Sequence, residues 1–169
     1  MKTADLVRYN IAVSELYFDA LNKLPWAEVI KPRGISFDSI RNVFLHLMFV
    51  EDRWISYTLK NRFTLWKDPS FESYHNMALI EEYMTKVKEN TEEFLQNLEP
   101  EDWARKVPNP WIHRPDAAIT IETALCHMVL EDMIHYGELS AVLWQLNLDA
   151  PYLAFLRYMY NQENSKKQL

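Results

Sequence analysis

Three histidines lie in strongly apolar, helix-like surroundings, where an imidazole can bind a metal ion away from bulk water. His46 lies in the run 43–50, and His127 and His135 lie in the run 125–135. Glu131 and His135 are four residues apart, which places both side chains on one face of a helix, one turn apart. From this spacing a carboxylate oxygen and an imidazole nitrogen can reach one ion at about 2.0–2.2 Å. We therefore predict that Glu131 and His135 supply two ligands to one divalent metal ion.

The third ligand is expected from another helix. His127 is one turn before Glu131, but each step of four residues rotates the side chain by about 40° around the helix. Two of the three side chains on this helix can therefore share an ion easily, whereas all three cannot. His46 lies at the edge of the apolar stripe of its own helix, where a side chain meets a neighbouring helix. The predicted ligand set is His46, Glu131 and His135, with His127 as the rival.

Simpler interpretations of these residues remain open. A histidine on an apolar face is usually a hydrogen-bonded core residue, and a Glu and a His four apart often form only a local helix pair. The three side chains would then be a buried polar cluster in a non-catalytic, stress-related dimerisation or binding protein. Other metal patterns are weaker, because the sequence has no His-Glu-x-x-His segment. A di-iron bundle needs two Glu-x-x-His pairs on different helices, and Glu72–His75 is one such pair at a helix start.

Hydrophobic periodicity predicts the elements that hold these residues. Apolar residues at 3/4 spacing indicate helices over about 3–24, 38–61, 73–98 and 120–146, and a short one over 152–160. Ser36 or Asp38 is the expected N-cap of the second helix and Thr120 that of the fourth. Gly34 and Gly137 are the two glycines in 169 residues, which favours long helices over strands and tight turns. We predict one all-α domain over 1–169, a four-helix bundle with long connectors and a short C-terminal helix.

Charge and cysteine content exclude several classes of partner and location. The net charge is −6 and no basic stripe is present, which argues against nucleic-acid binding. The densest cationic stretch, Lys166-Lys167, is too small to anchor the chain. No apolar run approaches the roughly 18 residues of a membrane span. With Cys126 as the one cysteine and no signal-peptide pattern at the start, we expect a cytoplasmic protein.

Two segments carry a resemblance to a known family. The first is 39–54, in which His46 is followed by the acidic Glu51 and then Trp54. The second is 127–138, in which His127, Glu131 and His135 precede Gly137. Together they resemble the motifs of the DinB/YfiT-like metalloenzyme superfamily, and the likeness covers nearly the whole chain. The resemblance implies a helical bundle in which three side chains, commonly three histidines, bind a divalent ion. Carried over by position, the three ligands are His46, Glu131 and His135.

The sequence departs from the family pattern at three positions. Glu131 stands in place of a histidine, and Tyr136 and Glu138 replace the usual Arg and Gln. A set of two His and one Glu resembles the mycothiol-dependent maleylpyruvate isomerase branch. The resemblance implies a metal-dependent transferase or isomerase that acts on a small-molecule substrate with a low-molecular-weight thiol. Nickel, zinc, iron and manganese all accept these ligands. It also implies a homodimer, for which 152–160 is the expected contact or a lid.

Overall fold

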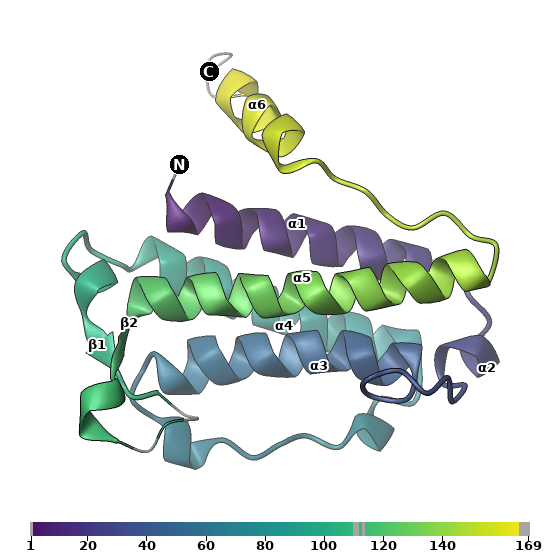
Figure 1. The fold of residues 1–169 in the computed structure, drawn as a ribbon, viewed down its shortest axis with the longest axis horizontal. Coiled ribbons are helices and arrows are strands. Elements are labelled where there is room, and N and C mark those ends of the chain that lie inside the picture. Colours follow the sequence, from purple (N-terminus) through teal and green to yellow (C-terminus); the bar gives the residue numbers. More distant parts are fainter. Residues whose placement is uncertain (1, 110–111, 113, 166–169) are drawn as a thin grey trace.

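Four long helices form the body of the protein in a computed structural model, which describes residues 2–109, 112 and 114–165. They lie side by side, and Figure 1 shows them as α1 (Thr3–Leu21), α3 (Ile40–Asp52), α4 (Met77–Gln96) and α5 (Ile121–Gln145). The predicted all-α class is confirmed. Within the described part of the chain, no helix has the length and apolar character needed to cross a membrane. Lys166 and Lys167 lie outside the described residues.

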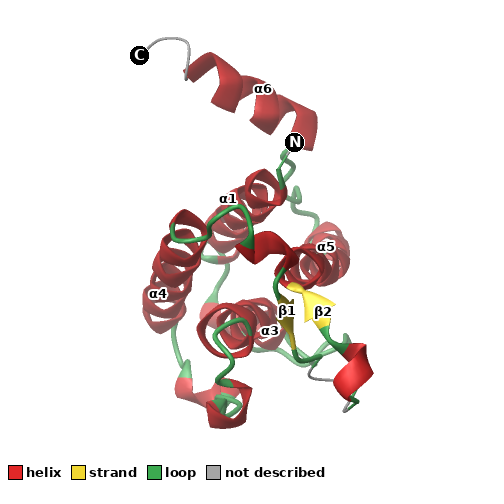
Figure 2. Ribbon diagram, turned by 90° about the vertical axis from the view of Figure 1, so that its left-hand side faces the viewer, coloured by secondary structure: helices red, strands yellow, loops and turns green. Residues whose placement is uncertain are grey.

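The four helices form a ring around a common apolar core, as the end-on view in Figure 2 shows. Helices α1 and α3 each pack against both α4 and α5, so α1 is diagonal to α3 and α4 is diagonal to α5. In Figure 1, α1 and α5 run in one direction and α3 and α4 in the other. The connectors 22–39 and 97–120 therefore cross the ring between diagonal helices, which explains why they are long.

The segments between the long helices contain short elements that hydrophobic periodicity does not predict. A two-stranded antiparallel sheet pairs β1 with β2, with Val107 opposite Ile119, next to the start of α5. The last turn of the second long helix is a π-helix in which the Leu59 amide donates to the Trp54 carbonyl at 2.9 Å. The remaining elements are α2 (Trp26–Val29), η1 (Arg53–Thr58), η2 (Phe63–Leu65), η3 (Phe71–Ser73), η4 (Asp102–Ala104), β1 (Lys106–Val107), η5 (Pro115–Ala117), β2 (Ile119–Thr120) and α6 (Phe155–Ser165).

The structure confirms one of the two predicted N-caps and corrects the other. Thr120 caps α5 as predicted, because its hydroxyl accepts from the Thr123 amide at 3.0 Å. The prediction of Ser36 or Asp38 for α3 is wrong: Ser39 is the cap, and its hydroxyl accepts from the Asn42 amide at 3.3 Å. Asp38 has a φ of 72°, a left-handed conformation, whereas an N-cap residue is normally extended.

The C-terminal helix lies further along the chain than predicted. It spans Phe155–Ser165 rather than 152–160 and packs against α1. The Tyr9 hydroxyl donates to the Leu153 carbonyl at 2.7 Å, which holds that residue in an extended segment before the helix begins. The Tyr9 ring also meets Phe155 edge-on, with the ring centroids 5.1 Å apart. Contacts from α1 therefore determine where α6 starts.

Parallel neighbours in the ring are joined by buried side-chain hydrogen bonds. Between α1 and α5, the Asn10 amide donates to Asp132 Oδ2 at 2.6 Å and the hydroxyls of Tyr17 and Ser140 are 2.5 Å apart. Because each bond joins one position on α1 to one position on α5, the two together determine how far the helices are displaced along their axes.

Helices α3 and α4 are joined in the same way. Thr91 donates to Glu51 Oε1 at 2.6 Å, and the Tyr83 hydroxyl donates to Asp52 Oδ2 at 2.8 Å. Glu51 is only 3% exposed. Burial raises the pKa of its carboxyl to about 7, although the hydrogen bond from Thr91 acts in the opposite direction. The folded protein therefore favours the neutral form of Glu51.

A Glu51→Gln variant should remove one source of pH dependence from the stability. Between about pH 4.5 and 7 the folded protein keeps a proton on Glu51 that the unfolded chain releases, so stability falls as the pH rises through this window. Glutamine cannot ionise, so the variant should gain on the order of 2 kcal/mol relative to the wild type at pH 8 but not at pH 5. Urea unfolding at both pH values measures this difference. Glu81→Gln, an exposed position on α4, is the control, and an equal effect of Glu51→Gln at both pH values would contradict the assignment.

Candidate metal centre

The three predicted ligand residues come together between α3 and α5. His46 is on α3, Glu131 and His135 are on α5, and one ligand atom from each lies within 4.8 Å of the others. Glu131 Oε1 and His135 Nε2 are 3.9 Å apart. Ligand atoms around a tetrahedral ion with bonds near 2.1 Å are about 3.4 Å apart, so small side-chain rotations bring the three into range. The donor set therefore fits a divalent ion, and metal binding itself remains a prediction.

His135 is oriented by a carboxylate on its other side. Its Nδ1 lies 3.1 Å from Glu138 Oε2, and an ionised carboxylate only accepts hydrogen bonds, so Nδ1 carries the proton and Nε2 keeps its lone pair. Glu138 is itself held by Ser36, whose amide and hydroxyl donate to it at 2.6 and 2.7 Å. Partial burial acts to raise the pKa of Glu138, but the hydrogen bonds from Ser36 and His135 outweigh it and the pKa is lowered. The anion that orients His135 is therefore stable at neutral pH.

The loop before α3 also packs against His46. The Phe37 ring stacks on the His46 ring, with the centroids 3.9 Å apart and the planes inclined by 22°. The next residue, Asp38, adopts the left-handed φ noted above, which aspartate tolerates better than most residues. Its amide donates to the Ile35 carbonyl at 2.9 Å, which closes a tight turn around Ser36 and Phe37. One turn thus contacts both histidine ligands.

His46 is held in the neutral form that metal binding requires. Burial and, to a smaller extent, the neighbouring His135 lower its pKa, Glu138 acts in the opposite direction, and the resulting pKa is about 4. The two imidazoles meet edge to face, with the centroids 4.9 Å apart. At neutral pH a metal ion therefore does not need to displace a proton from His46.

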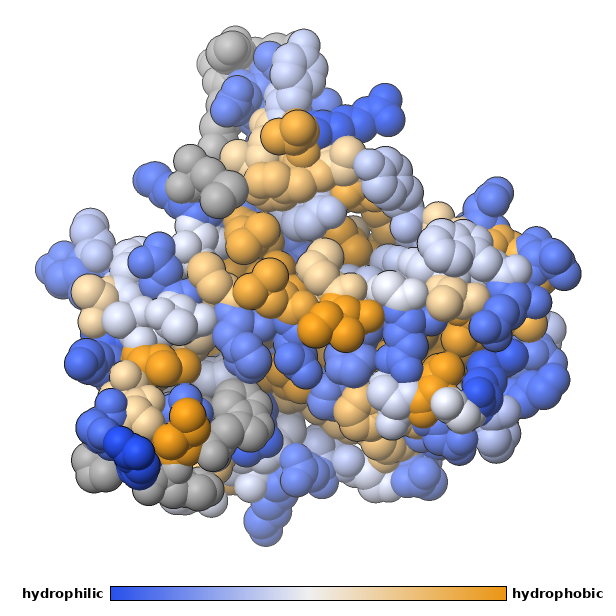
Figure 3. Space-filling model, viewed as in Figure 1, coloured by the Kyte–Doolittle hydropathy of each residue, from blue (hydrophilic) through white to orange (hydrophobic). Residues whose placement is uncertain are grey.

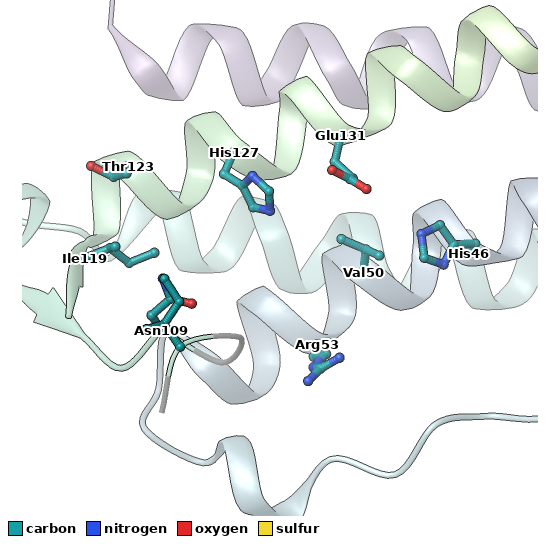
Figure 4. A pocket seen from close by; sticks show the side chains of 9 residues that line it. His46, Val50, Arg53, Asn109, Ile119, Thr123, His127 and Glu131 are labelled. Carbon is teal, nitrogen blue, oxygen red and sulfur yellow. The ribbon is translucent and has the colours of Figure 1, made fainter. Parts of the chain in front are cut away.

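A cavity of about 580 Å³ opens beside the ligand residues, within the usual size range of small-molecule sites. In Figure 4, His127 and Glu131 project from α5 into the space between α5 and α3, and His46 lies at one end of that space. His46 and Glu131 line the cavity. The remaining described lining residues are Val50, Arg53, Asn109, Ile112, Ile119, Thr123 and His127.

The structure separates His127 from the ligand group. His127 is exposed and lines the cavity, and its ring meets Trp54 edge-on at 6.1 Å, but it is not among the three residues whose ligand atoms converge. Asp132 and Tyr136, each next in sequence to a predicted ligand, are buried and are not among the described lining residues of the cavity. Asp132 instead holds α5 against α1.

Sequence reasoning missed residues that contact the ligands. Glu138 is three residues after His135 on the same helix, and this spacing could have identified it as a partner of the histidine. Ser36 and Phe37 belong to a turn, and no sequence periodicity places a turn against a distant helix. Arg53 lines the cavity rather than contacting a ligand; it is seven residues after His46 on the same helix face and could have been found by extending the helical stripe to the next two turns.

Removing the carboxylate behind His135 should weaken metal binding. In a Glu138→Ala variant Nδ1 loses its acceptor and the ring loses its orientation, so the affinity for Zn²⁺ or Ni²⁺ should fall about 10–100-fold. Glu138→Gln keeps an acceptor oxygen and should lie between the wild type and the alanine variant. Competition with a chromophoric chelator measures the affinity, and Glu89→Ala, exposed on α4, is the control. Equal affinities for Glu138→Ala and the wild type would exclude this role.

The comparisons with known proteins agree with this geometry. No curated protein matches the chain. The family model described as "DinB family" matches residues 1–167, nearly the full length, including both helices that carry the ligand residues. The chain therefore belongs to the DinB family.

Proposed function

We propose that this protein is a metal-dependent enzyme in which His46, Glu131 and His135 bind one divalent ion. The observation that supports this best is that two of the three ligand residues line a cavity large enough for a small molecule. Three protein ligands leave at least one coordination position for water or substrate, which is typical of catalytic rather than structural sites. Nickel, zinc, iron and manganese all suit two imidazoles and a carboxylate.

The proposed reaction is a transfer or isomerisation that uses a low-molecular-weight thiol. Support comes from the DinB family membership and from the mainly apolar cavity beside the ligands. When bound, a divalent ion would supply an electrophilic centre that makes a thiol or water more acidic. His127 is the histidine among the described lining residues that is not a proposed ligand, so we assign to its imidazole the role of accepting the proton that the thiol loses.

Metal content tests the ligand assignment. The wild-type protein should contain close to one equivalent of a divalent metal, and His46→Ala and His135→Ala should each lose most of it, because two remaining ligands bind weakly. Elemental analysis and metal titration measure this, with His75→Ala, an exposed histidine outside the site, as the control. A metal-free wild type whose titration matches those of both variants would show that the site is not a metal centre.

Thiol consumption with the same samples tests the chemistry. Metal-loaded wild type and His75→Ala should accelerate conjugation of small thiols to a model electrophile, whereas chelated protein and His46→Ala should not. Metal binding without any thiol-dependent rate would leave the metal centre in place and reject the thiol-dependent reaction.

A homodimer is the assembly that we propose, and an exposed apolar stripe on α5 supports it. Leu130, Ile134, Gly137, Ala141 and Trp144 follow one another at alternating spacings of four and three and are all exposed. Figure 3 shows hydrophobic side chains in the middle of the face where α5 runs. Glycine inside a helix costs about 1 kcal/mol relative to alanine, and the space beyond Gly137 is open. A second copy crossing at Gly137 would approach closely and bring its own stripe against this one.

An Ile134→Lys variant should disrupt this dimer, because a charge would be buried at the centre of the contact. Light scattering after gel filtration should show the mass of a dimer for the wild type and of a monomer for the variant. Leu65→Lys changes an equally exposed apolar residue away from the stripe and should remain dimeric. A dimer that survives Ile134→Lys would exclude this face as the contact.

A further inference from the structure

The chemical character of the cavity beside the metal ligands changes from one end to the other. His46, Val50 and Arg53 follow one another on one face of the second long helix, so Arg53 lies about 10 Å along the axis from His46. Because α5 runs in the opposite direction to α3, its cavity residues follow this path with descending residue number, first Glu131 and then His127. Figure 4 shows His46 on α3 at one end of the cavity and Arg53 further along the same chain segment, in η1. A molecule lying in the cavity with one end at His46 would reach Arg53 with the other.

Arg53 brings a permanent positive charge to this cavity. It is the one lysine or arginine among the described lining residues, and its guanidinium stays charged at any working pH. Its Cζ lies 5.3 Å from the centroid of the Phe63 ring, so an aromatic face supports the guanidinium. Arg53 is also the first residue of the π-helical turn, and its carbonyl accepts from the Thr58 hydroxyl at 3.0 Å. The backbone that carries this side chain is therefore well defined.

The wall that the second long helix presents between His46 and Arg53 is apolar, because Val50 lies between them. Ile112 also lines the cavity, and Ile119 lies further along it, beside Thr123 (Figure 4). A guanidinium beside apolar side chains binds a carboxylate strongly, because two parallel hydrogen bonds form where water competes poorly. A dianionic phosphate would leave one negative charge without a partner at a single arginine. The chemistry therefore favours a monocarboxylate.

We infer that Arg53 recognises a carboxylate, and that the substrate or co-substrate is a small carboxylic acid whose metal-binding end is separated from the carboxylate by an apolar chain. This inference rests on the proposed metal site for one end of the molecule. A divalent ion would offer a coordination position for a thiolate at one end of such a molecule, and the guanidinium of Arg53 offers two parallel donors for a carboxylate at the other.

The test compares 6-mercaptohexanoate with 6-mercaptohexanol, which has the same sulfur and chain but no carboxylate. Protein loaded with Co²⁺ reports sulfur binding through its visible absorption spectrum. The wild type should bind 6-mercaptohexanoate about 10–100-fold more tightly than 6-mercaptohexanol. Arg53→Gln should abolish this preference without changing the affinity for 6-mercaptohexanol, and Arg53→Lys should retain part of it. Arg41→Gln removes an arginine that pairs with Glu72 outside the cavity and should behave as the wild type.

Chain length provides a second criterion. Mercaptoacetate can chelate the ion but cannot span the distance to Arg53, so Arg53→Gln should leave its affinity unchanged. The inference would be overturned if the wild type showed no preference for 6-mercaptohexanoate, or if Arg53→Gln showed an equally large one. Either result would leave the metal site intact.

Failure of the metal site is separately visible, because Co²⁺ would then give no bound spectrum. In that case hexanoate is titrated into metal-free protein and followed by NMR chemical shifts. Shifts around the cavity in the wild type that are lost in Arg53→Gln but not in Arg41→Gln would support carboxylate recognition without a metal. Identical shifts in the wild type and Arg53→Gln, or none in either, would reject it.

Discussion

His46 and the Glu131–His135 pair come from helices that run in opposite directions, so their meeting depends on how far α3 is displaced along α5. A shift of one helical turn would move His46 by about 5 Å and separate it from both partners. Among the described residues, the buried hydrogen bonds that control this displacement do not link α3 directly to α5. They join α1 to α5 and α3 to α4, as two internally connected pairs. The ligand residues lie where these two pairs meet, so one bound ion would link them.

The turn before α3 also helps to fix the orientation of the ligand side chains. Ser36 reaches across to Glu138, which orients His135, while Phe37 stacks on His46. A single short segment therefore sets the rotation of one ligand and shields the ring of another. The Glu138 side chain occupies the place at which the family usually has glutamine, and either residue offers an oxygen to His135 Nδ1. This departure from the family pattern is thus compatible with the same structural role.

Local signals predicted what lies within one helix. Glu131 and His135 could be paired because a spacing of four is a property of the helix itself. The approach of His46 was different: periodicity placed it at the edge of an apolar stripe where a neighbouring helix was expected, and the family resemblance indicated the same ligand set. Ser36 and Phe37 could not be predicted, because their contacts depend on the left-handed turn at Asp38. The start of α6 was misplaced for a similar reason, since Tyr9 holds Leu153 from another helix.

The division into two helix pairs has a consequence for the order of folding. The bonds between α3 and α4 join residues 31 and 40 positions apart, whereas those between α1 and α5 join residues 122 and 123 positions apart. Closing a longer loop costs more chain entropy, so the pair in the middle of the sequence can assemble before the ends meet. The helix that carries His46 would then be in place before α5 arrives with Glu131 and His135. The site is completed only when α5 packs against α3, so an ion bound there stabilises this later contact and cannot guide the earlier assembly of α3 with α4.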